Sequence, residues 1–409
     1  MVTLKDIQRV STFLEGVIHP TPLILSQTLN KHQGSKVYLK LESLQKTGSF
    51  KLRGAYNKII HLPSARRSQG VITASAGNHA QGVAYAASLF SLPALIVMPE
   101  RTPLIKISAT KNHGAEVVLR GNNFDEACIY ARQLMEERNL TFIPPFDDEE
   151  VIAGQGTIGL EILRNLPNVN TVIVPIGGGG LISGTAIALK ETNSHVRVIG
   201  VEAKGAASMH HSIQNGTIKE IEMVKTIADG ISIKQPGKIT FPLVQRYVDE
   251  IVLVEEEEIA EAVLTFMEKE KLLVEGAGAV PLAALLGDRV NIPNGQVVLV
   301  ISGGNIDVNI IARIIEKGLV KSGRLLRLSL ELEDVPGTLH RLTSIIAQKQ
   351  ANILHIIHDR LGKTLPIGVT NLELDLETRS REHSQEVIAV LEADGYFPCL
   401  IQGLQEEKL

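Results

Sequence analysis

The sequence is poor in cysteine and in aromatic residues, and it contains no tryptophan. Its 409 residues include two cysteines, Cys128 and Cys399, and only 4% aromatic side chains. Two cysteines are too few for a disulfide framework, which excludes the class of small disulfide-stabilised secreted domains. They fit a reducing compartment, so we expect a cytoplasmic protein.

Long apolar runs and long runs of one charge are also missing. The most apolar stretch, residues 83–99, is interrupted by serine and proline and falls short of the roughly 18 apolar residues that a membrane span requires. The first ten residues lack the apolar core of a signal peptide. The net charge is −4 and no basic run occurs, so we expect neither nucleic acid nor a membrane as a partner.

Short apolar runs rich in β-branched residues alternate with helical patterns through the first 320 residues. Continuous apolar strands separated by helices predict an α/β fold of parallel sheets, divided into two lobes, with ligands beyond the C-terminal ends of the strands. The expected strands are 70–75, 94–99, 115–120, 141–146, 171–176, 196–202 and 296–302. The expected helices are 78–90, 103–112, 123–139, 181–191 and 305–317.

The pattern changes near residue 322. Residues 325–334 alternate between apolar and polar, as a half-buried strand does. A helix (336–350), two strands (351–360 and 369–378), a second helix (382–393) and a last strand (396–401) follow. This β-α-β-β-α-β order predicts a ferredoxin-like unit. We therefore expect two domains, 1–321 and 325–409.

Four consecutive glycines, Gly177 to Gly180, separate an expected strand from an expected helix. Glycine amides at a helix N-terminus form a phosphate site. No Gly-Lys-Ser/Thr arrangement follows, which excludes a nucleoside triphosphate loop. A dinucleotide fingerprint fits better, because Glu202 closes the next strand, but its glycine spacing is one residue too long. A tight turn explains one or two glycines and not four, so we interpret this loop as a phosphate site.

A lysine stands at the start of an expected helix, 51–60, in the segment KTGSFKLRGA. Ser49 is a plausible N-cap, and Arg53 could reach solvent. Lys51 meets the positive end of the helix dipole. It is either a solvated surface lysine or an amine of lowered pKa that acts as nucleophile or base.

Three further loops each allow a simple structural explanation. Asn78 could cap the helix that follows it, and His79 could be a surface histidine. Ser302 or Asn305 could cap the helix after residues 300–305, and residues 274–279 form a glycine-rich bend. In a parallel sheet, however, loops at strand ends lie near one crevice.

An amine, a phosphate site, an asparagine and a neutral hydroxyl are the groups that pyridoxal phosphate requires. Residues 49–55, 75–79, 177–181 and 302–305 resemble, in order, the motifs of fold-type II pyridoxal-phosphate enzymes, which have the tryptophan synthase β-like fold. Within that family the first 320 residues look most like threonine dehydratases (threonine ammonia-lyases). Residues 334–339 resemble the first loop of an ACT regulatory domain.

The resemblance implies a role for each motif. Lys51 would bind the cofactor covalently and remove the Cα proton, while Asn78 would meet the ring hydroxyl and Ser302 the ring nitrogen. The cofactor phosphate would be held by Gly177, Gly178, Gly179, Gly180 and Leu181. The substrate carboxylate would be held by Ser75, Ala76, Gly77, Asn78 and His79.

The reaction implied by the resemblance is a β-elimination. L-Threonine would give 2-oxobutanoate and ammonia, and L-serine would give pyruvate, with the cofactor phosphate as the acid that protonates the leaving hydroxyl. The ACT-like unit implies allosteric control by an amino acid such as isoleucine or valine, a link to isoleucine biosynthesis, and a homo-oligomer, either dimer or tetramer. The sequence does not determine whether threonine or serine is the preferred substrate. It also does not determine whether the role is biosynthetic or catabolic.

Three alternatives remain. A serine racemase or serine dehydratase of the same family is the nearest, but such racemases carry a second serine where this chain has Ala76. Racemase-like members also bind a divalent metal beside the strand that ends here in Glu202; the acidic partner expected near Ser208 is absent, so we expect no metal. A non-catalytic amino-acid sensor conflicts with the intact Lys51, and a dinucleotide-dependent dehydrogenase fits least.

Overall fold

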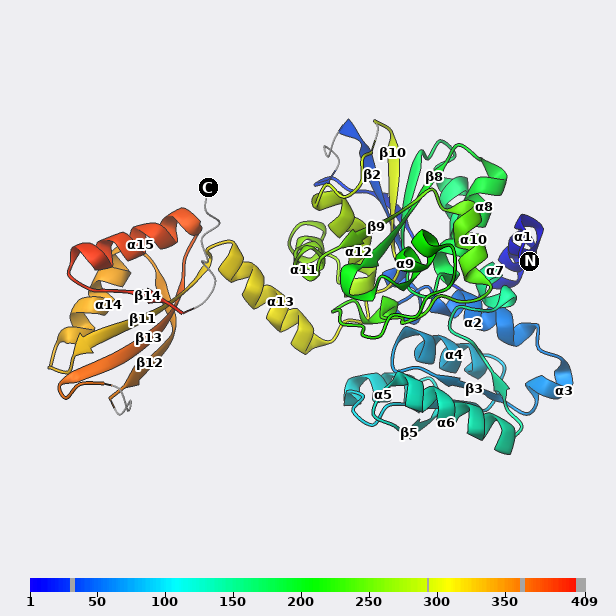
Figure 1. Ribbon diagram of the computed structural model, residues 1–409, viewed down its shortest axis with the longest axis horizontal. Helices are drawn as coiled ribbons and strands as arrows, with labels where there is room; N and C mark the ends of the chain where they lie inside the picture. Colours follow the sequence, from blue (N-terminus) through cyan, green and yellow to red (C-terminus); the bar gives the residue numbers. More distant parts are fainter. Residues whose placement is uncertain (30–33, 293, 361–364, 402–409) are drawn as a thin grey trace. The chain divides into compact units, whose positions relative to one another are not determined.

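The computed structural model describes residues 1–29, 34–292, 294–360 and 365–401 (Figure 1). Contacts divide the chain into two compact units, Met1–Asp307 and Val308–Leu409. Helix α13 (Val308–Lys321), which the sequence prediction placed in the first domain, groups with the second unit. Residues 402–409 of the expected second domain lie outside the described residues.

A six-stranded sheet forms the larger lobe of the first unit, in the order β1-β2-β10-β7-β8-β9. Five of these strands run parallel to one another: β2, β10, β7, β8 and β9. Strand β1 is antiparallel to its neighbour β2. Val172–Val174 and Val297–Ile301 have no exposed surface, as expected for strands covered on both faces. The strands are β1 (Leu23–Leu25), β2 (Lys36–Leu41), β7 (Thr171–Pro175), β8 (Arg197–Ala203), β9 (Glu250–Val254) and β10 (Gln296–Ile301).

Helices cover both faces of this sheet. Helix α12 packs on strands β7 to β10, whereas α7 and α8 pack against each other, and Figure 1 shows them on the other side of β8. The helices of this lobe are α1 (Leu4–Leu14), α7 (Glu149–Asn165), α8 (Gly180–Thr192), α9 (Ser208–Asn215), α10 (Thr240–Tyr247), α11 (Glu256–Thr265) and α12 (Gly276–Leu286). The short 3-10 helices η2 (Glu42–Leu44) and η4 (Asp229–Ile231) lie in connections.

A four-stranded parallel sheet, β5-β4-β3-β6, forms the smaller lobe. Helix α2 (Lys51–Ile60) packs on both α4 and α7, and so connects the lobes. The strands are β3 (Val71–Ala74), β4 (Ala94–Met98), β5 (Glu116–Leu119) and β6 (Thr141–Phe142). The helices are α3 (Ser64–Arg67), α4 (Asn78–Ser88), α5 (Leu104–Lys111) and α6 (Phe124–Glu137). The two-lobed α/β fold predicted from the sequence is confirmed.

The second unit has the predicted β-α-β-β-α-β order and an antiparallel sheet, β12-β13-β11-β14. Leucines on one face of β11 and β13 are buried with residues of both helices, among them Leu342 and Val387. After α13, the elements are β11 (Leu325–Glu333), α14 (Thr338–Gln348), β12 (Asn352–Asp359), β13 (Val369–Glu377), α15 (Arg381–Ala393) and β14 (Cys399–Leu400).

Two predicted helix caps are wrong. The residue that caps α2 is Phe50, not Ser49, because Ser49 forms a β-bridge with Gly303 and its hydroxyl is buried without a hydrogen bond. The helix expected from residue 305 begins at Val308, because the Asn305 side chain instead bonds Asn78 and the Thr47 carbonyl. In both cases a tertiary contact replaces the local cap. In the described part of the chain, no helix is long and apolar enough to span a membrane.

Candidate active site

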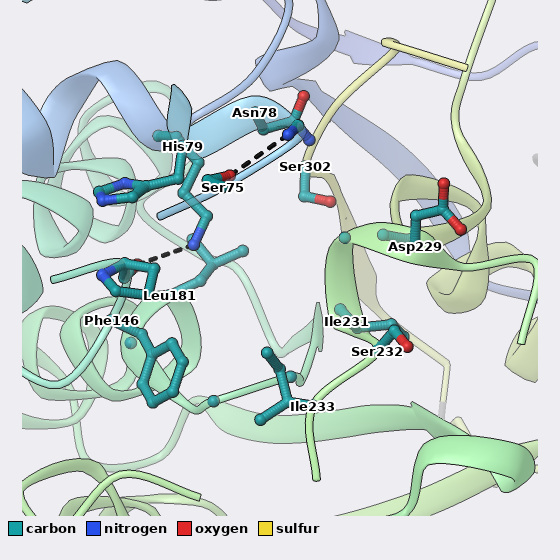
Figure 2. A pocket seen from close by; sticks show the side chains of 18 of the residues that line it. Ser75, Asn78, His79, Phe146, Leu181, Asp229, Ile231, Ser232, Ile233 and Ser302 are labelled. Atoms are coloured by element: carbon teal, nitrogen blue, oxygen red, sulfur yellow. Dashed lines mark hydrogen bonds between the residues drawn. The ribbon is translucent and has the colours of Figure 1, made fainter. Parts of the chain in front are cut away.

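A cavity of about 340 Å³ lies between the two lobes of the first unit, where β3, β7 and β10 end. Figure 2 shows Asn78 and Ser302 near the top of the cavity and Phe146 and Ile233 near the bottom. Every residue for which the sequence predicted a site role lines this cavity: Lys51, Ser75, Ala76, Gly77, Asn78, His79, Gly177, Gly178, Gly179, Gly180, Leu181 and Ser302.

Lys51 begins α2 and directs its amine into the cavity. The amine donates a 2.7 Å hydrogen bond to the carbonyl oxygen of Pro145 and lies 5.2 Å from the centre of the Phe50 ring. Burial lowers the pKa of Lys51 to about 8, although the charge of Glu275 opposes this shift. Of the two hypotheses for this lysine, the structure favours the amine of lowered pKa over the solvated surface lysine.

The glycine loop follows β7 and opens α8, as expected. A Cβ on Gly178 would lie 2.4 Å from atoms of the Phe146 ring, so no larger residue fits there without displacing that ring. Gly179 caps α8 with a φ of +92°, which other residues rarely adopt. The amides of the first turn of α8 have no partner within the helix, and they make this loop a site for an anion.

His79 is not the surface histidine that its sequence position allowed. It is 3% exposed, and its Nε2 lies 2.9 Å from the carbonyl oxygen of Ile143. Burial and the neighbouring Lys51 lower the pKa of His79 to about 3. The imidazole is therefore neutral, and because the Ile143 carbonyl can only accept, Nε2 carries the proton.

Glu275 is the main group that the sequence analysis missed. The expected bend at 274–279 is instead the start of α12, which Glu275 caps. Its carboxylate lines the cavity and accepts a 2.7 Å hydrogen bond from Asn78 Nδ2. Burial raises the pKa of Glu275 to about 7. An acidic residue directly before a glycine-rich helix start was the available signal, but only the fold brings it opposite Asn78.

An ion pair stands at the edge of the cavity. Lys106 of α5 and Asp229 of η4 both line it, and their charged atoms are 3.0 Å apart. Sequence analysis had no means of pairing them, because they come from different lobes and lie far apart in the chain. The pair joins the two lobes beside the site.

Arg53 does not reach solvent as expected. It is completely buried because α2 lies between α4 and α7, and its guanidinium binds Glu42 at 2.8 Å and Glu161 at 2.6 Å. Lys40 is also buried and pairs with Glu161. Two cations and two carboxylates thus compensate one another inside the protein, and Arg53 is only two residues from Lys51.

Glu202 is the second-last residue of β8 and is buried. Its two carboxylate oxygens accept hydrogen bonds from the backbone amides of Met209, at 2.9 Å, and His210, at 2.7 Å. Burial raises the pKa of Glu202 to about 8 despite these bonds. Within residues 1–29, 34–292, 294–360 and 365–401, no three histidine, cysteine or acidic residues group as a metal site; that the protein binds no metal stays a prediction.

Comparison with known proteins shows which family has this arrangement of residues. Residues 14–303 match the family model described as pyridoxal-phosphate dependent enzyme. The chain is 54% identical over 397 residues to the L-threonine ammonia-lyase of Geobacter sulfurreducens, with 97% of this chain and 99% of that protein covered.

Solved structures show the same similarity. The maize serine racemase structure superimposes with a TM-score of 0.74 at 35% identity, covering 78% of this chain and 98% of the other. The processed form of threonine deaminase isoform 2 from Solanum lycopersicum gives a TM-score of 0.73 at 42% identity, covering 76% and 86%. With its buried amine and glycine loop on one cavity, the chain belongs to the fold-type II family of pyridoxal-phosphate dependent enzymes.

Proposed function

We propose that the protein is a threonine ammonia-lyase that converts L-threonine to 2-oxobutanoate and ammonia and also accepts L-serine. The observation that carries the proposal is the position of the Lys51 amine on the same cavity as the glycine loop of α8. The 54% identity to an L-threonine ammonia-lyase along almost the whole chain supports the choice of reaction.

The cavity fits pyridoxal phosphate. The side chain of Phe146 lies against Gly178, and the bare glycine backbone with the first amides of α8 suits a phosphate group. Lys51 provides the amine for covalent attachment. Asn78 and Ser302 provide neutral polar groups for the ring hydroxyl and the ring nitrogen, while Gly177–Leu181 would hold the phosphate.

Bound pyridoxal phosphate supplies the electron sink that makes the Cα–H of an amino acid acidic. The chain supplies the base. Because burial lowers the pKa of Lys51 to about 8, about a tenth of the free amine is neutral at pH 7, far more than for an ordinary lysine, and this neutral amine can accept the Cα proton. His79 cannot be the acid near neutral pH, because its pKa of about 3 leaves it without a second proton.

The loop from Ser75 to His79 suits the substrate carboxylate. Its residues line the cavity where α4 begins. The positive end of the helix dipole there would stabilise a bound carboxylate. The Ser75 hydroxyl accepts a hydrogen bond from the Gly77 amide at 3.2 Å, which shapes the loop. Phe146 and Ile233 line the opposite wall and can contact the substrate's methyl group.

A racemase is the second candidate, because a serine racemase structure superimposes well. Racemisation needs a proton donor on the face of Cα opposite Lys51. The position next to Ser75 is Ala76, which lines the cavity and has no proton to give. This residue favours elimination over racemisation.

The test is an assay of purified protein with L-threonine. We expect pyridoxal phosphate to turn the protein yellow, borohydride to bleach the colour, and 2-oxobutanoate to accumulate with ammonia. The same assay with L-serine should release pyruvate. A protein that binds the cofactor but releases D-amino acids rather than oxo acids would be a racemase, and one that binds no cofactor would be neither.

For the second unit we propose regulation by an amino acid, with isoleucine or valine as effector, and assembly into a homo-oligomer. Strand β12 is at the edge of its sheet, and Leu354, Ile356 and Ile357 are 56%, 41% and 47% exposed. A second copy added along β12 would cover them. The loop 334–338 and the start of β12 would then face the neighbouring copy, where an amino acid could bind.

Regulation requires that the effector bind two states of the enzyme with different affinity, by about 1–3 kcal/mol in typical cases. Threonine saturation curves with and without isoleucine or valine test this, together with a protein that ends at Lys321. We expect either ligand to shift the curve of the full chain and not that of the shortened one. If neither ligand shifts the full-length curve, the proposal is wrong for those two amino acids.

A further inference from the structure

The amide of Asn78 is held from two sides. Its Nδ2 donates to Glu275 at 2.7 Å, and its Oδ1 accepts a hydrogen bond from Asn305 Nδ2 at 2.8 Å. Asn305 also donates to the carbonyl oxygen of Thr47 at 2.8 Å, so its own amide is oriented as well. The three side chains come from the start of α4, the cap of α12 and the loop after β10, and all line the cavity.

These contacts allow only one orientation of the Asn78 amide. The nitrogen and oxygen of an asparagine amide are similar in shape, and a 180° rotation usually costs little. Here the Glu275 carboxylate is an acceptor and the Asn305 amide nitrogen is a donor. A rotated Asn78 would place oxygen against oxygen and nitrogen against nitrogen, and both hydrogen bonds would be lost.

An asparagine Nδ2 has two hydrogens, and Glu275 uses only one of them. The second hydrogen is left for a group in the cavity. We propose that Glu275 and Asn305 are positioning residues, which hold the Asn78 amide so that this second N–H donates to the ring hydroxyl oxygen of bound pyridoxal phosphate and favours its ionised form. The proposal rests on the role of Asn78 in the function proposed above.

The two positioning residues differ in charge, and this difference distinguishes their effects. Asn305 is neutral, and without its donated hydrogen bond the Asn78 amide is held by Glu275 alone. The rotated amide, with its oxygen toward the ring oxygen, then becomes more populated. Above its pKa of about 7, Glu275 adds negative charge near that oxygen. The other charged groups that act on Glu275 are Asp229, Lys106 and Lys51. A substitution that removes the charge of Glu275 but keeps a hydrogen-bond acceptor should therefore leave the ionised form of the ring hydroxyl at least as favourable as before.

The experiment compares N305D with E275Q by the absorption of the bound cofactor, without substrate. An ionised ring hydroxyl gives the long-wavelength yellow band and a neutral one gives a shorter-wavelength band. In N305D we expect the ratio of the yellow band to the short-wavelength band to fall about five- to tenfold, the change expected for one lost hydrogen bond. In E275Q, where the new side chain can still accept from Asn78, the ratio should stay equal or rise.

Circular dichroism and the thermal midpoint show whether each variant is folded, and N305A provides a second variant without the donor. Loss of the yellow band in N305D and N305A but not in E275Q supports the proposal. Equal loss in all three, or no change in N305D and N305A, overturns it. If the unmodified protein shows no yellow band that borohydride bleaches, the proposed function itself fails, which is a different result.

Discussion

The Lys51 amine and the Pro145 carbonyl oxygen are 2.7 Å apart, and both residues line the cavity. Lys51 begins α2, whereas Pro145 lies between β6 and α7. The hydrogen bond keeps the amine inside the cavity and away from water, which is the environment that lowers its pKa to about 8.

Lys51→Ala should abolish turnover, because both the covalent attachment and the base are lost. General bases contribute about 10²–10⁴-fold to rates, so we expect at least that loss in 2-oxobutanoate release. The glycine loop should still hold the cofactor noncovalently. Lys46→Ala, in the turn before α2, is the control and should keep its activity; sustained multiple turnovers by Lys51→Ala would contradict the role of this lysine.

Ser302→Asp should slow elimination. A carboxylate beside the ring nitrogen would hold it protonated and delocalise the electrons left after proton removal, whereas the neutral Ser302 hydroxyl does not. We expect a long-wavelength absorption band that appears with L-threonine and a lower rate of 2-oxobutanoate release. Ser302→Ala should show no such band. If Ser302→Asp matches the parent enzyme in spectrum and rate, Ser302 does not meet the ring nitrogen.

Gly178→Ala should weaken cofactor binding. The new Cβ would lie 2.4 Å from the Phe146 ring and must displace either the ring or the loop. Overpacking of this kind costs about 1–3 kcal/mol, or roughly 5- to 150-fold in affinity. Titration with pyridoxal phosphate, followed by cofactor fluorescence, measures the change. A second substitution, Phe146→Ala, should restore part of the affinity; no restoration would show that the loop fails for another reason.

Arg53→Met should destabilise the fold by about 3–5 kcal/mol, since it leaves Glu42 buried with only part of its compensation. Urea unfolding measures the loss, with the exposed Arg66→Met as control. Adding Glu42→Leu should recover part of the stability, because the unpaired charge is then removed. If Arg53→Met is as stable as Arg66→Met, solvent reaches the buried charges around Glu42.

Glu202 should make stability depend on pH. Its pKa rises from 4.5 to about 8 on folding, so between these values the folded state binds more protons than the unfolded state. The contribution of Glu202 to stability is therefore full at low pH and falls as pH rises, by up to about 1.4 kcal/mol per pH unit. Thermal midpoints from about pH 5 to about pH 8 should show a smaller fall for Glu202→Gln than for the exposed Glu136→Gln. Parallel profiles would contradict the prediction.

The periodicity of the sequence was sufficient to predict the fold class and most of the strands and helices in the part of the chain that the structure describes. Apolar β-branched runs such as 171–176 are typical of buried parallel strands, and residues 325–334 alternate as a half-buried strand does. The strands and α-helices that were not predicted are β1, β2, β9, α1, α3, α7, α9, α10, α11 and α12. Helix α12 gives no periodic signal, because it is apolar on all sides and has no helical stripe.

The sequence by itself determined which chemical groups were available: the amine of Lys51, the four glycines and the hydroxyl of Ser302, each in a segment whose local pattern marks it. Tertiary structure alone decided what surrounds them. Glu275 meets Asn78 from 197 positions away in the chain, and Arg53 is buried because α2 lies between two helices. Local sequence carries no information on such contacts, because they depend on how separate elements pack, and packing sets the burial that shifts each pKa.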